Sequence, residues 1–302
     1  MRAVWSFWSR PFRTYYGNIW CKPLHHLLAW KLSVETASRH YPDTVLITDR
    51  PGKKLLVDQL GLHFAQVSTE LDRLDNADPG WWALGKLVAY SLQDRPFVHL
   101  DTDVFLWKRL PRHITESPVF TQYPEGFYEQ GPHYRPQDIE WAFAQQSLNL
   151  PLEWIWARSN RSHFPAENCG VLGGTHVEFL RFYAQTAVDL VLRPENAAAW
   201  SRLPDKRAYN IVLEQFFLSA CAGFHRIHPT SPYRGVQISH LFSSWEYAFD
   251  PNYAARAGFT HLVAGAKSHP AVGRRLEERA LRQDPAFFRR CEQLLAQNDR
   301  LV

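Results

Sequence analysis

The sequence predicts an α/β fold in which a mixed, mainly parallel sheet is flanked by helices. The first observation is that short apolar runs alternate with segments of helical periodicity through the first half of the chain, a pattern typical of βαβ units. The second is composition: the chain is 45% hydrophobic and 21% charged, which provides a large core and excludes a disordered protein. The third is the length of 302 residues, which predicts one large domain or two closely fused ones.

The first half of the chain supplies strands and helices in alternation. A strand is expected at Arg2–Phe7, followed by a helix at residues 23–40, where leucines recur at helical spacing. Residues 96–101, with the sequence PFVHLD, form the clearest strand. The other elements expected in this half are strands at Thr44–Thr48 and 64–68 and helices at 53–60 and 80–92.

Residues 122–165 differ in character from the rest of the chain. They are rich in Tyr, Trp, His and Pro, and their periodicity is weak. A segment of this kind inside a compact domain predicts a long functional excursion over the surface, in which Tyr123, Tyr128 and Trp156 would offer stacking surfaces to a ligand. The alternative is an aromatic-rich structural subdomain.

Regular elements are expected again after this segment. The tail, from residue 272 to 297, predicts two helices that break at Asp284-Pro285. The other expected elements are strands at 168–172, 224–227 and 260–263 and helices at Val177–Leu192 and 206–222.

Charge and composition exclude several classes of protein. The formal net charge is only +4, with 34 basic residues spread among 30 acidic ones, so nothing points to nucleic acid as a partner. No apolar run approaches the roughly 18 residues of a membrane span, and the aromatic amino terminus does not resemble a signal peptide, so a cytoplasmic location is expected. The four cysteines lie far apart without CxxC spacing, which excludes a zinc knuckle and predicts reduced thiols.

A pair of aspartates, Asp101 and Asp103, follows the clearest strand. Residues two apart on an extended chain project to the same side, and open α/β sheets bind ligands at the carboxyl ends of their strands. Adjacent carboxylates repel each other unless a cation lies between them, and hard oxygen donors suit Mn²⁺ or Mg²⁺. The pair therefore predicts a divalent-metal site. The alternative is that one aspartate caps a turn and the other is solvated.

Three further residues are candidates for ligand binding because of their place in the predicted fold. Thr48 and Asp49 end the second strand, where Asp49 would accept a hydrogen bond from a ligand or would serve as a turn residue before Pro51. Lys86 lies on the helix before the metal strand, where it would reach toward the ligand or lie on a solvent face.

The segment PFVHLDTDVFL resembles the Asp-x-Asp strand of GT-A-fold glycosyltransferases, particularly the glycogenin-like and bacterial galactosyltransferase-like families. Other segments follow the order of that fold over residues 1–270. They are a first strand with Val4, Trp5 and Ser6 at the nucleotide pocket, Asn168 in an Asn-x-Gly strand, Glu214 and Gln215 on a helix, and His261 with Gly265 and Lys267. Two departures stand out: Glu214 replaces the family's Asp, and Gly265 lies one position later than the family spacing.

The resemblance implies a GT-A (Rossmann-like) domain at residues 1–270, with 122–165 on the acceptor side, and a C-terminal helical extension at 271–302. It implies transfer of a sugar from a nucleotide-sugar donor, expected to be a uridine diphosphate sugar, to a glycan or glycolipid acceptor. It also implies that Mn²⁺ or Mg²⁺ is held by Asp101, Asp103 and a histidine. His261 is the expected third ligand, and His240 is its rival.

The resemblance and the sheet positions together assign the remaining roles. The expected catalytic residues are Glu214, Gln215 and Asn168. The expected donor-binding residues are Val4, Trp5, Ser6, Thr48, Asp49, Lys86, Asp101 and Lys267. Each has a structural alternative: Trp5 as a core side chain, His261 as a packed histidine and Lys267 as a surface residue.

Three other interpretations stay open. A phosphohydrolase of the haloacid-dehalogenase type also ends a strand with Asp-x-Asp, but it places the pair on its first strand and has Thr or Val where this chain has Phe105. A nucleotide- or sugar-binding protein on the same fold would lack the chemistry. The basic tail predicts either solvated helices or a peripheral contact with an anionic membrane.

Overall fold

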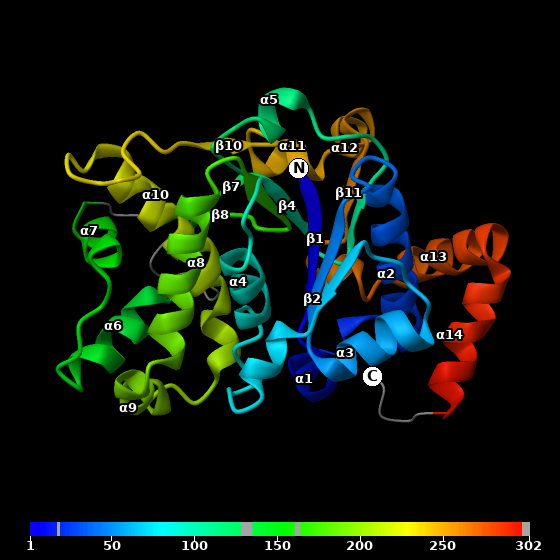
Figure 1. Cartoon of the computed structure of the whole chain (residues 1–302), viewed down its shortest axis with the longest axis horizontal. Helices are drawn as coiled ribbons and strands as arrows, with labels where there is room; N and C mark the ends of the chain where they lie inside the picture. Colours follow the sequence, from blue (N-terminus) through cyan, green and yellow to red (C-terminus); the bar gives the residue numbers. More distant parts are fainter. Residues whose placement is uncertain (17–18, 128–134, 161–163, 298–302) are drawn as a thin grey trace. The chain divides into compact units, whose positions relative to one another are not determined.

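The computed structural model describes residues 1–16, 19–127, 135–160 and 164–297. It is mixed α/β, with a mainly parallel central sheet flanked by helices, as the sequence predicts (Figure 1). The chain divides into two compact units, and neither is a continuous stretch of sequence. The unit that we call the N–C unit consists of residues 2–79, 100–110 and 254–302, and the middle unit consists of residues 1, 80–99 and 111–253.

The N–C unit is built on three parallel strands. These are, in spatial order, β1 (Arg2–Phe7), β2 (Thr44–Thr48) and β3 (Gln66–Ser68). The residues of β1 and β2 are almost all buried, which explains why both read in the sequence as apolar runs without alternation. Helix α2 (Pro23–Ser38) connects β1 to β2, and the indole nitrogen of Trp5 in β1 donates a hydrogen bond to Ser33 Oγ in α2 (2.9 Å).

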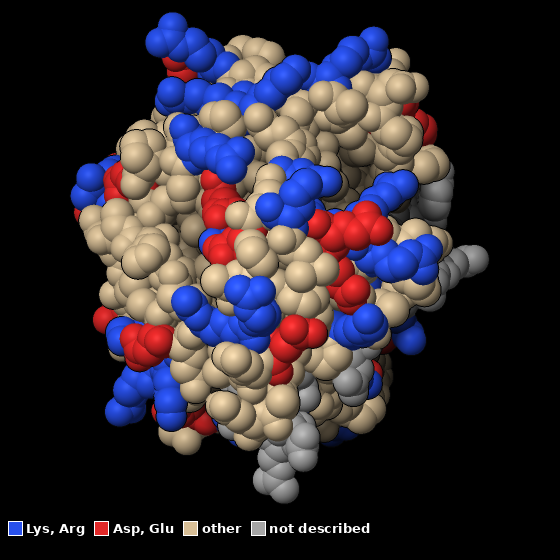
Figure 2. All heavy atoms as spheres, turned by 90° about the vertical axis from the view of Figure 1, so that its right-hand side faces the viewer, with Lys and Arg blue, Asp and Glu red and all other residues tan. Residues whose placement is uncertain are grey.

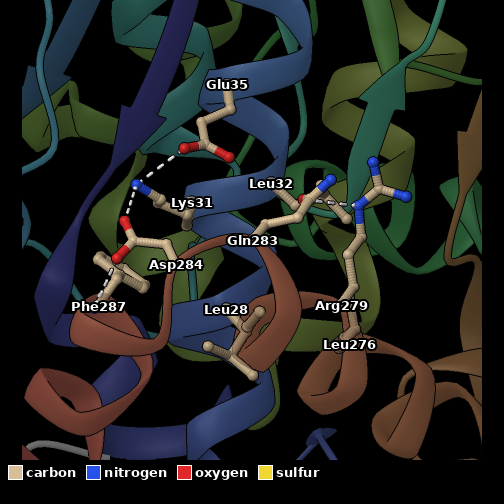
Figure 3. A pocket seen from close by; sticks show the side chains of 10 residues that line it. Leu28, Lys31, Leu32, Glu35, Leu276, Arg279, Gln283, Asp284 and Phe287 are labelled. Atoms are coloured by element: carbon tan, nitrogen blue, oxygen red, sulfur yellow. Dashed lines mark hydrogen bonds and ion pairs between the residues drawn. The ribbon is translucent and has the colours of Figure 1, made fainter.

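Helix α2 is buried along most of its length, because the tail helices cover it. α13 (Pro270–Gln283) and α14 (Pro285–Gln297) both pack on α2 (Figure 3). The Lys31 ammonium of α2 lies 2.8 Å from carboxylate oxygens of Glu35 and Asp284 and 4.9 Å from the ring centroid of Phe287. The space left among these helices is about 20 Å³, roughly one water molecule, so this contact is a packed interface rather than a ligand site.

The closest approach of the tail to α2 is at Gly273. A Cβ atom at this position would lie 2.1 Å from Cε1 of His25, so only glycine lets α13 approach the imidazole. Glu277, one turn later on α13, accepts from His25 Nε2 and from Lys22 Nζ, each at 2.8 Å. The tail is therefore an integral part of the N–C unit.

Charges of both signs cover the face that carries the tail (Figure 2). Acidic side chains lie between the basic ones there, as expected of solvated helices. Among the described residues, no helix combines the length and the apolar character that crossing a membrane requires.

A small antiparallel pair completes the N–C unit. β5 (Val104–Leu106) pairs with β11 (Phe259–His261), so that residues far apart in sequence lie opposite each other. This pair carries the candidate site described below. Short helical segments make up much of the rest of the unit: Ser9–Pro11, Phe12–Tyr16, Arg50–Lys53, Lys54–Gln59, Glu70–Leu74 and Ala264–Ala266. α12 (Pro251–Ala257) leads into β11.

The middle unit has its own strands and helices. The strands lie in the order β10 (Ile238–His240), β6 (Val119–Thr121), β9 (Val171–Gly174) and β4 (Phe97–Leu100), with β10 and β6 parallel and β6 and β9 antiparallel. A separate antiparallel pair joins β7 (Pro124–Phe127) to β8 (Phe164–Glu167). Its helices are α4 (Leu84–Ser91), α5 (Arg112–Thr115), α6 (Pro136–Ala144), α7 (Leu152–Asn160), α8 (Val177–Leu192), α9 (Ala197–Ser201), α10 (Phe217–Ile227) and α11 (Trp245–Phe249), with shorter turns at Pro194–Asn196, Lys206–Tyr209 and Val212–Phe216.

Several elements confirm the sequence predictions. The strands at Arg2–Phe7 and Thr44–Thr48 and the helix at Val177–Leu192 have the predicted bounds. The tail breaks at Asp284, whose Oδ1 accepts a hydrogen bond from the Phe287 amide (2.9 Å) and so caps α14.

One prediction in the middle unit is wrong. The strand expected at 224–227 is the last turn of α10, because a run of only four residues, FHRI, fits a helix as well as a strand. The helix expected at 206–222 is confirmed, but its geometry is irregular before α10 begins at Phe217. Within this irregular part, the side chain of Asn210 accepts from the Ala83 amide and donates to the Gly80 carbonyl, each at 2.8 Å. These side-chain bonds compete with regular helix geometry.

The described part of the 122–165 segment is structured. It contains β7, α6 and α7, and the Trp154 side chain is 1% exposed between Phe216 and Phe217. Its aromatic residues therefore serve largely as core, which matches the alternative of a structural subdomain. The two short helices α6 and α7 bury some large side chains and expose others, such as Trp141, Leu152 and Ile155, so their apolar residues show little periodicity.

Candidate functional site

Asp101 and Asp103 lie in a tight turn between β4 and β5. The amide of Val104 donates a hydrogen bond to the Asp101 carbonyl (3.0 Å), and Ser33 Oγ donates to the same carbonyl at 3.3 Å. The turn, rather than the extended chain that the spacing predicts, brings the two carboxylates together. Because Ser33 also accepts from Trp5, a chain of hydrogen bonds runs from the centre of β1 to the turn.

The β5–β11 pairing brings a histidine to this turn. His261, the last residue of β11, lies opposite Val104, and the amide of Leu262 donates to the Asp103 carbonyl (3.0 Å). The His261 Nε2 atom is 3.6 Å from Asp103 Oδ1. One ligand atom from each of Asp101, Asp103 and His261 lies within 4.8 Å of the other two. The three residues expected to hold a metal therefore form one cluster, which we call the DDH cluster.

Lys267 adds a positive charge to the DDH cluster. Its ammonium nitrogen lies 2.6 Å from Asp103 Oδ2, and its carbonyl accepts a hydrogen bond from the Cys21 amide (3.0 Å). The contact is a close ion pair, and His261 interacts with the same carboxylate. A carboxylate has about four lone-pair sites, so Asp103 keeps sites that a cation can use.

Asp103 is a buried carboxylate that stays charged. Its exposed fraction is 2%, and burial by itself raises the pKa of the carboxyl. The charges of Lys267 and His261 lower the pKa by more, so the net shift is downward. A desolvated carboxylate beside a second carboxylate and an imidazole has the donor set of a divalent-metal site, and oxygen and nitrogen donors together suit Mn²⁺.

His26 of α2 was not among the predicted residues, yet it lies in the electrostatic field of this cluster. Burial is the main cause that lowers its pKa, the positive charge of Lys267 adds to this shift, Asp103 opposes it, and the resulting pKa is about 3. The imidazole is packed against aromatic rings, with Phe12 4.1 Å and Trp20 5.9 Å away between centroids. His26 is therefore a neutral, aromatic-packed wall beside the charged group. The adjacent histidines at positions 25 and 26 on an apolar helix were the signal for it.

The residues predicted to bind the nucleotide have structural roles in the N–C unit. Val4 and Trp5 are fully buried, whereas Ser6 is partly exposed. Thr48 Oγ1 donates to the Phe7 carbonyl (2.7 Å). Asp49 accepts from the Gly52 amide (2.8 Å), as a helix cap does, so the alternative of a turn residue describes it.

The Asp49 carboxyl also ties two chain segments together. It accepts hydrogen bonds from the amide and the hydroxyl of Ser9, at 3.0 and 2.7 Å. Burial raises its pKa, and these hydrogen bonds offset part of that shift. Asp49 thereby fixes the segment after β1 to the end of β2.

Lys86 and Glu214 pair with each other in the interior of the middle unit. The Lys86 ammonium lies 2.8 Å from Glu214 Oε1, and the Glu214 side chain is 0% exposed. Tyr90 donates to the same oxygen at 2.9 Å. This geometry gives both residues a packing role, while their predicted catalytic and donor-binding roles remain predictions. Because the Glu214 side chain is fully buried, a substrate cannot reach it in this state.

Asn168 and Gln215 also lie in the middle unit. The Asn168 amide nitrogen donates to Tyr123 Oη (3.1 Å) and to Glu125 Oε1 (2.8 Å), and its oxygen accepts from the Gly170 amide. Gln215 is partly exposed. The side chain of Asn168 is thus committed to local contacts, and its predicted role remains a prediction.

His240, the rival of His261, is paired elsewhere. Its Nε2 lies 2.7 Å from Glu167 Oε2 in the middle unit. Geometry therefore favours His261 as the third member of the metal cluster.

The aromatic side chains expected to bind an acceptor are placed differently from the prediction. Tyr123 is 3% exposed, Trp156 packs partly exposed against Phe224, and Tyr128 lies outside the described residues. In the 122–165 segment, Trp141 of α6 is exposed (51%), and further large exposed aromatics occur in and after α11. These are Trp245, Tyr247, Phe249 and Tyr253, with exposed fractions of 57, 46, 51 and 40%. Their spacing in the run WEYAFDPNY was the signal that the sequence analysis missed.

Residues 1–294 match the model of one protein family, described as a family of unknown function, DUF6734. The chain belongs to this family. The DUF6734 match includes the DDH cluster, Lys267 and most of the tail, so these parts belong to the domain that the family shares. No curated protein matches the chain.

Proposed function

We propose that this DUF6734 protein is a metal-dependent glycosyltransferase that uses a nucleotide-sugar donor. The observation that carries the proposal is the DDH cluster: two carboxylates and an imidazole converge where a βαβ-type sheet ends, with a lysine at their edge. The resemblance of PFVHLDTDVFL to the Asp-x-Asp strand of GT-A-fold enzymes supports the same reading. We infer a uridine diphosphate sugar as donor from that resemblance.

The DDH cluster fits Mn²⁺ or Mg²⁺, held by Asp101, Asp103 and His261. When bound there, such an ion would supply the positive charge that stabilises a departing diphosphate. The buried position of Asp103 favours this use, because electrostatic interactions are stronger away from water. A solvated aspartate pair would bind the same ion more weakly.

Lys267 would bind the diphosphate directly. Its ammonium is within reach of Asp103, and a flexible lysine can transfer that contact to a phosphate oxygen when a donor arrives. The lysine would then neutralise part of the leaving-group charge, while Trp5 and Ser33 hold the Asp101 turn in place.

The acceptor is proposed to be a glycan or glycolipid. The exposed aromatic side chains of residues 245–253 offer flat faces on which sugar rings can stack. Two of them, Trp245 and Phe249, pack edge to face with centroids 6.2 Å apart, which keeps both rings in place. We propose this surface, in place of Tyr123, as an acceptor determinant.

Metal-dependent donor binding tests the proposal. Isothermal titration of the full chain with uridine diphosphate should show binding in the presence of Mn²⁺ and a loss of at least about tenfold in its absence. Asp101→Asn and Asp103→Asn should each abolish the Mn²⁺ effect, since the amide keeps the shape and removes the charge. Asp58→Asn, an exposed aspartate of the same unit, is the matched control.

Three results would overturn the proposal. Uridine diphosphate affinity that is indifferent to Mn²⁺ and to both variants would remove the metal site. Release of inorganic phosphate from an aryl phosphate, lost in Asp101→Asn, would instead identify a phosphohydrolase. Donor binding that depends on the cluster, without turnover of any nucleotide sugar, would leave a binding protein.

A further inference from the structure

A second candidate site lies in the middle unit, in a pocket of about 260 Å³. Three elements line it. Helix α10 contributes one face, with Ser219, Ala222, Gly223 and Arg226 at helical spacing. Strand β8 contributes Pro165 and Glu167, and strand β10 contributes Ile238 and His240, in each case two residues apart and so on the same side of the strand. Regular elements therefore build the pocket. Its volume is close to the lower end of the range for small-molecule sites.

One of the residues lining the pocket is a buried carboxylate whose oxygens accept hydrogen bonds from neighbouring side chains. Glu167 is 6% exposed, and its Oε2 accepts from Thr121 Oγ1 (3.0 Å) and from His240 Nε2 (2.7 Å). Ser219 Oγ lies 3.5 Å from Oε1. Burying a carboxylate is costly without such partners, so these hydrogen bonds stabilise Glu167. The same contact holds the His240 ring in one orientation.

The orientation of His240 leaves one ring nitrogen for a ligand. A carboxylate only accepts hydrogen bonds, so Nε2–H is the donor to Glu167, and Nδ1 of the neutral ring is an acceptor. His240 is partly exposed, with a side-chain exposure of 25%. An imidazole that a buried carboxylate orients toward a polar pocket is suited to accept a hydrogen bond from a hydroxyl group.

The pocket lining also contains a positively charged side chain, Arg226. Among the described residues, the guanidinium of Arg226 has no ion-pair partner, and Glu167 is occupied by its own donors. Arg226 follows Ala222 and Gly223 on the pocket face of α10, and the carboxamide of Gln237 lies in the facing loop. Arg226 is therefore the charged side chain of the lining that is available to pair with a ligand. Ala222, Val236 and Ile238 add short apolar walls.

We propose that this pocket binds a small hydroxylated anion, a sugar acid or a sugar phosphate. Arg226 binds the anionic group, His240 Nδ1 accepts from a ring hydroxyl, and the apolar walls contact the ring face. A guanidinium pairs with a carboxylate or a phosphate through two parallel hydrogen bonds, so both sources share one chemistry. The assignment is independent of the DDH cluster and does not rest on the proposed function.

Calorimetric titration of the full chain with glucuronate, glucose 6-phosphate and glucose tests the proposal. At least one anionic sugar should bind with a dissociation constant below about 10 mM, and glucose should bind at least about tenfold more weakly. Comparing the two anions distinguishes a carboxylate ligand from a phosphate one. The titration needs no metal, so failure of the metal-dependent function would leave its outcome unchanged.

Two variants and one control locate the binding. Arg226→Gln removes an exposed charge without disturbing the core and should weaken the anionic sugar about tenfold to a hundredfold. His240→Phe fills the same space without an acceptor and should also weaken it, while Arg234→Gln, an exposed arginine outside the pocket lining, should have no effect. Equal affinity for glucose and for the anions, no binding of any of the three, or equal losses in Arg226→Gln and Arg234→Gln would each overturn the proposal.

Discussion

The ammonium nitrogen of Lys267 lies 2.6 Å from Oδ2 of Asp103, and His261 approaches the other oxygen of the same carboxylate to 3.6 Å. One buried carboxylate therefore carries both the predicted metal ligand and the predicted phosphate-binding residue as neighbours. A divalent cation and the ammonium would compete for Asp103, so loading of the metal and release of Lys267 are coupled under the proposed function.

This competition predicts opposite effects of Lys267→Met on two ligands. Without nucleotide, the variant should bind Mn²⁺ about tenfold more tightly, since a competing charge is gone. With Mn²⁺ present, it should bind uridine diphosphate more weakly, because the lysine no longer contacts a phosphate. Mn²⁺ binding followed by electron paramagnetic resonance measures the first effect, and calorimetry measures the second. Lys22→Met, an exposed lysine, is the control, and weaker Mn²⁺ binding in Lys267→Met would contradict the coupling.

The identity of the third ligand is tested with a pair of histidine variants. His261→Ala should weaken Mn²⁺ binding by about tenfold to a hundredfold, whereas His240→Ala, paired with Glu167, should leave it unchanged. Binding should also weaken at acidic pH, since a protonated imidazole cannot hold a metal. A larger loss in His240→Ala would show that the ligand is misassigned.

His26 predicts a pH dependence of stability. Its pKa is lowered to about 3 in the folded protein, against about 6.5 in an unfolded chain, so the unfolded state binds the proton more readily. The favourable contribution of the neutral histidine is fully present above pH 6.5 and is lost as the pH falls toward 3. The slope is about 1.4 kcal/mol of unfolding free energy per pH unit in that window.

Urea unfolding between pH 7 and 4 measures this dependence. His26→Phe should reduce the slope, and His113→Asn, an exposed histidine, should not. The buried imidazole of His99, whose pKa burial also lowers, should retain part of the slope in the variant. A slope that His26→Phe leaves unchanged would show that His26 is protonated or solvated in the folded state.

Gly273 predicts a steric limit at the tail. Gly273→Ala places a methyl group 2.1 Å from the His25 ring, which Glu277 holds in place, and should destabilise the protein by about 1–3 kcal/mol. Gly126→Ala, where a methyl group meets no atom within 4 Å, is the matched control. Thermal unfolding of both compares them, and a Gly273→Ala protein as stable as the parent would mean that α13 does not approach α2 this closely.

Local patterns predicted much of the fold. The strands at Arg2–Phe7 and Thr44–Thr48 read correctly because they are buried on both sides and bounded by clear turns. The strand predicted at 224–227 is wrong, because four residues carry too little periodicity to distinguish the end of a helix from a strand. The irregular helix geometry near Asn210 accompanies hydrogen bonds between its side chain and residues 80 and 83, which lie far away in the sequence, so no local pattern predicts it.

In the candidate site, too, residues within a short motif could be predicted, whereas contacts between residues distant in sequence could not. Asp101 and Asp103 are adjacent and follow a strand, so their place was predictable, and His261 was found by its order in the family pattern. The ion pair between Glu214 and Lys86 could not be predicted, because the sequence does not show that Glu214 is buried beside this lysine. The pocket over Glu167 was missed because His240 is separated from it by 73 residues and neither belongs to a short motif.

The covering of α2 by the tail has a consequence for biosynthesis. α13 and α14 follow α2 by more than 200 residues in the chain, so during synthesis the apolar face that they cover stays uncovered until that stretch has been made. During that interval it exposes Leu28 and Leu32 to water. A nascent chain in this state is the kind of species that chaperones bind and that aggregates when production is fast. Expression yield should therefore depend on chaperone supply and on slow synthesis more than on the stability of the finished protein.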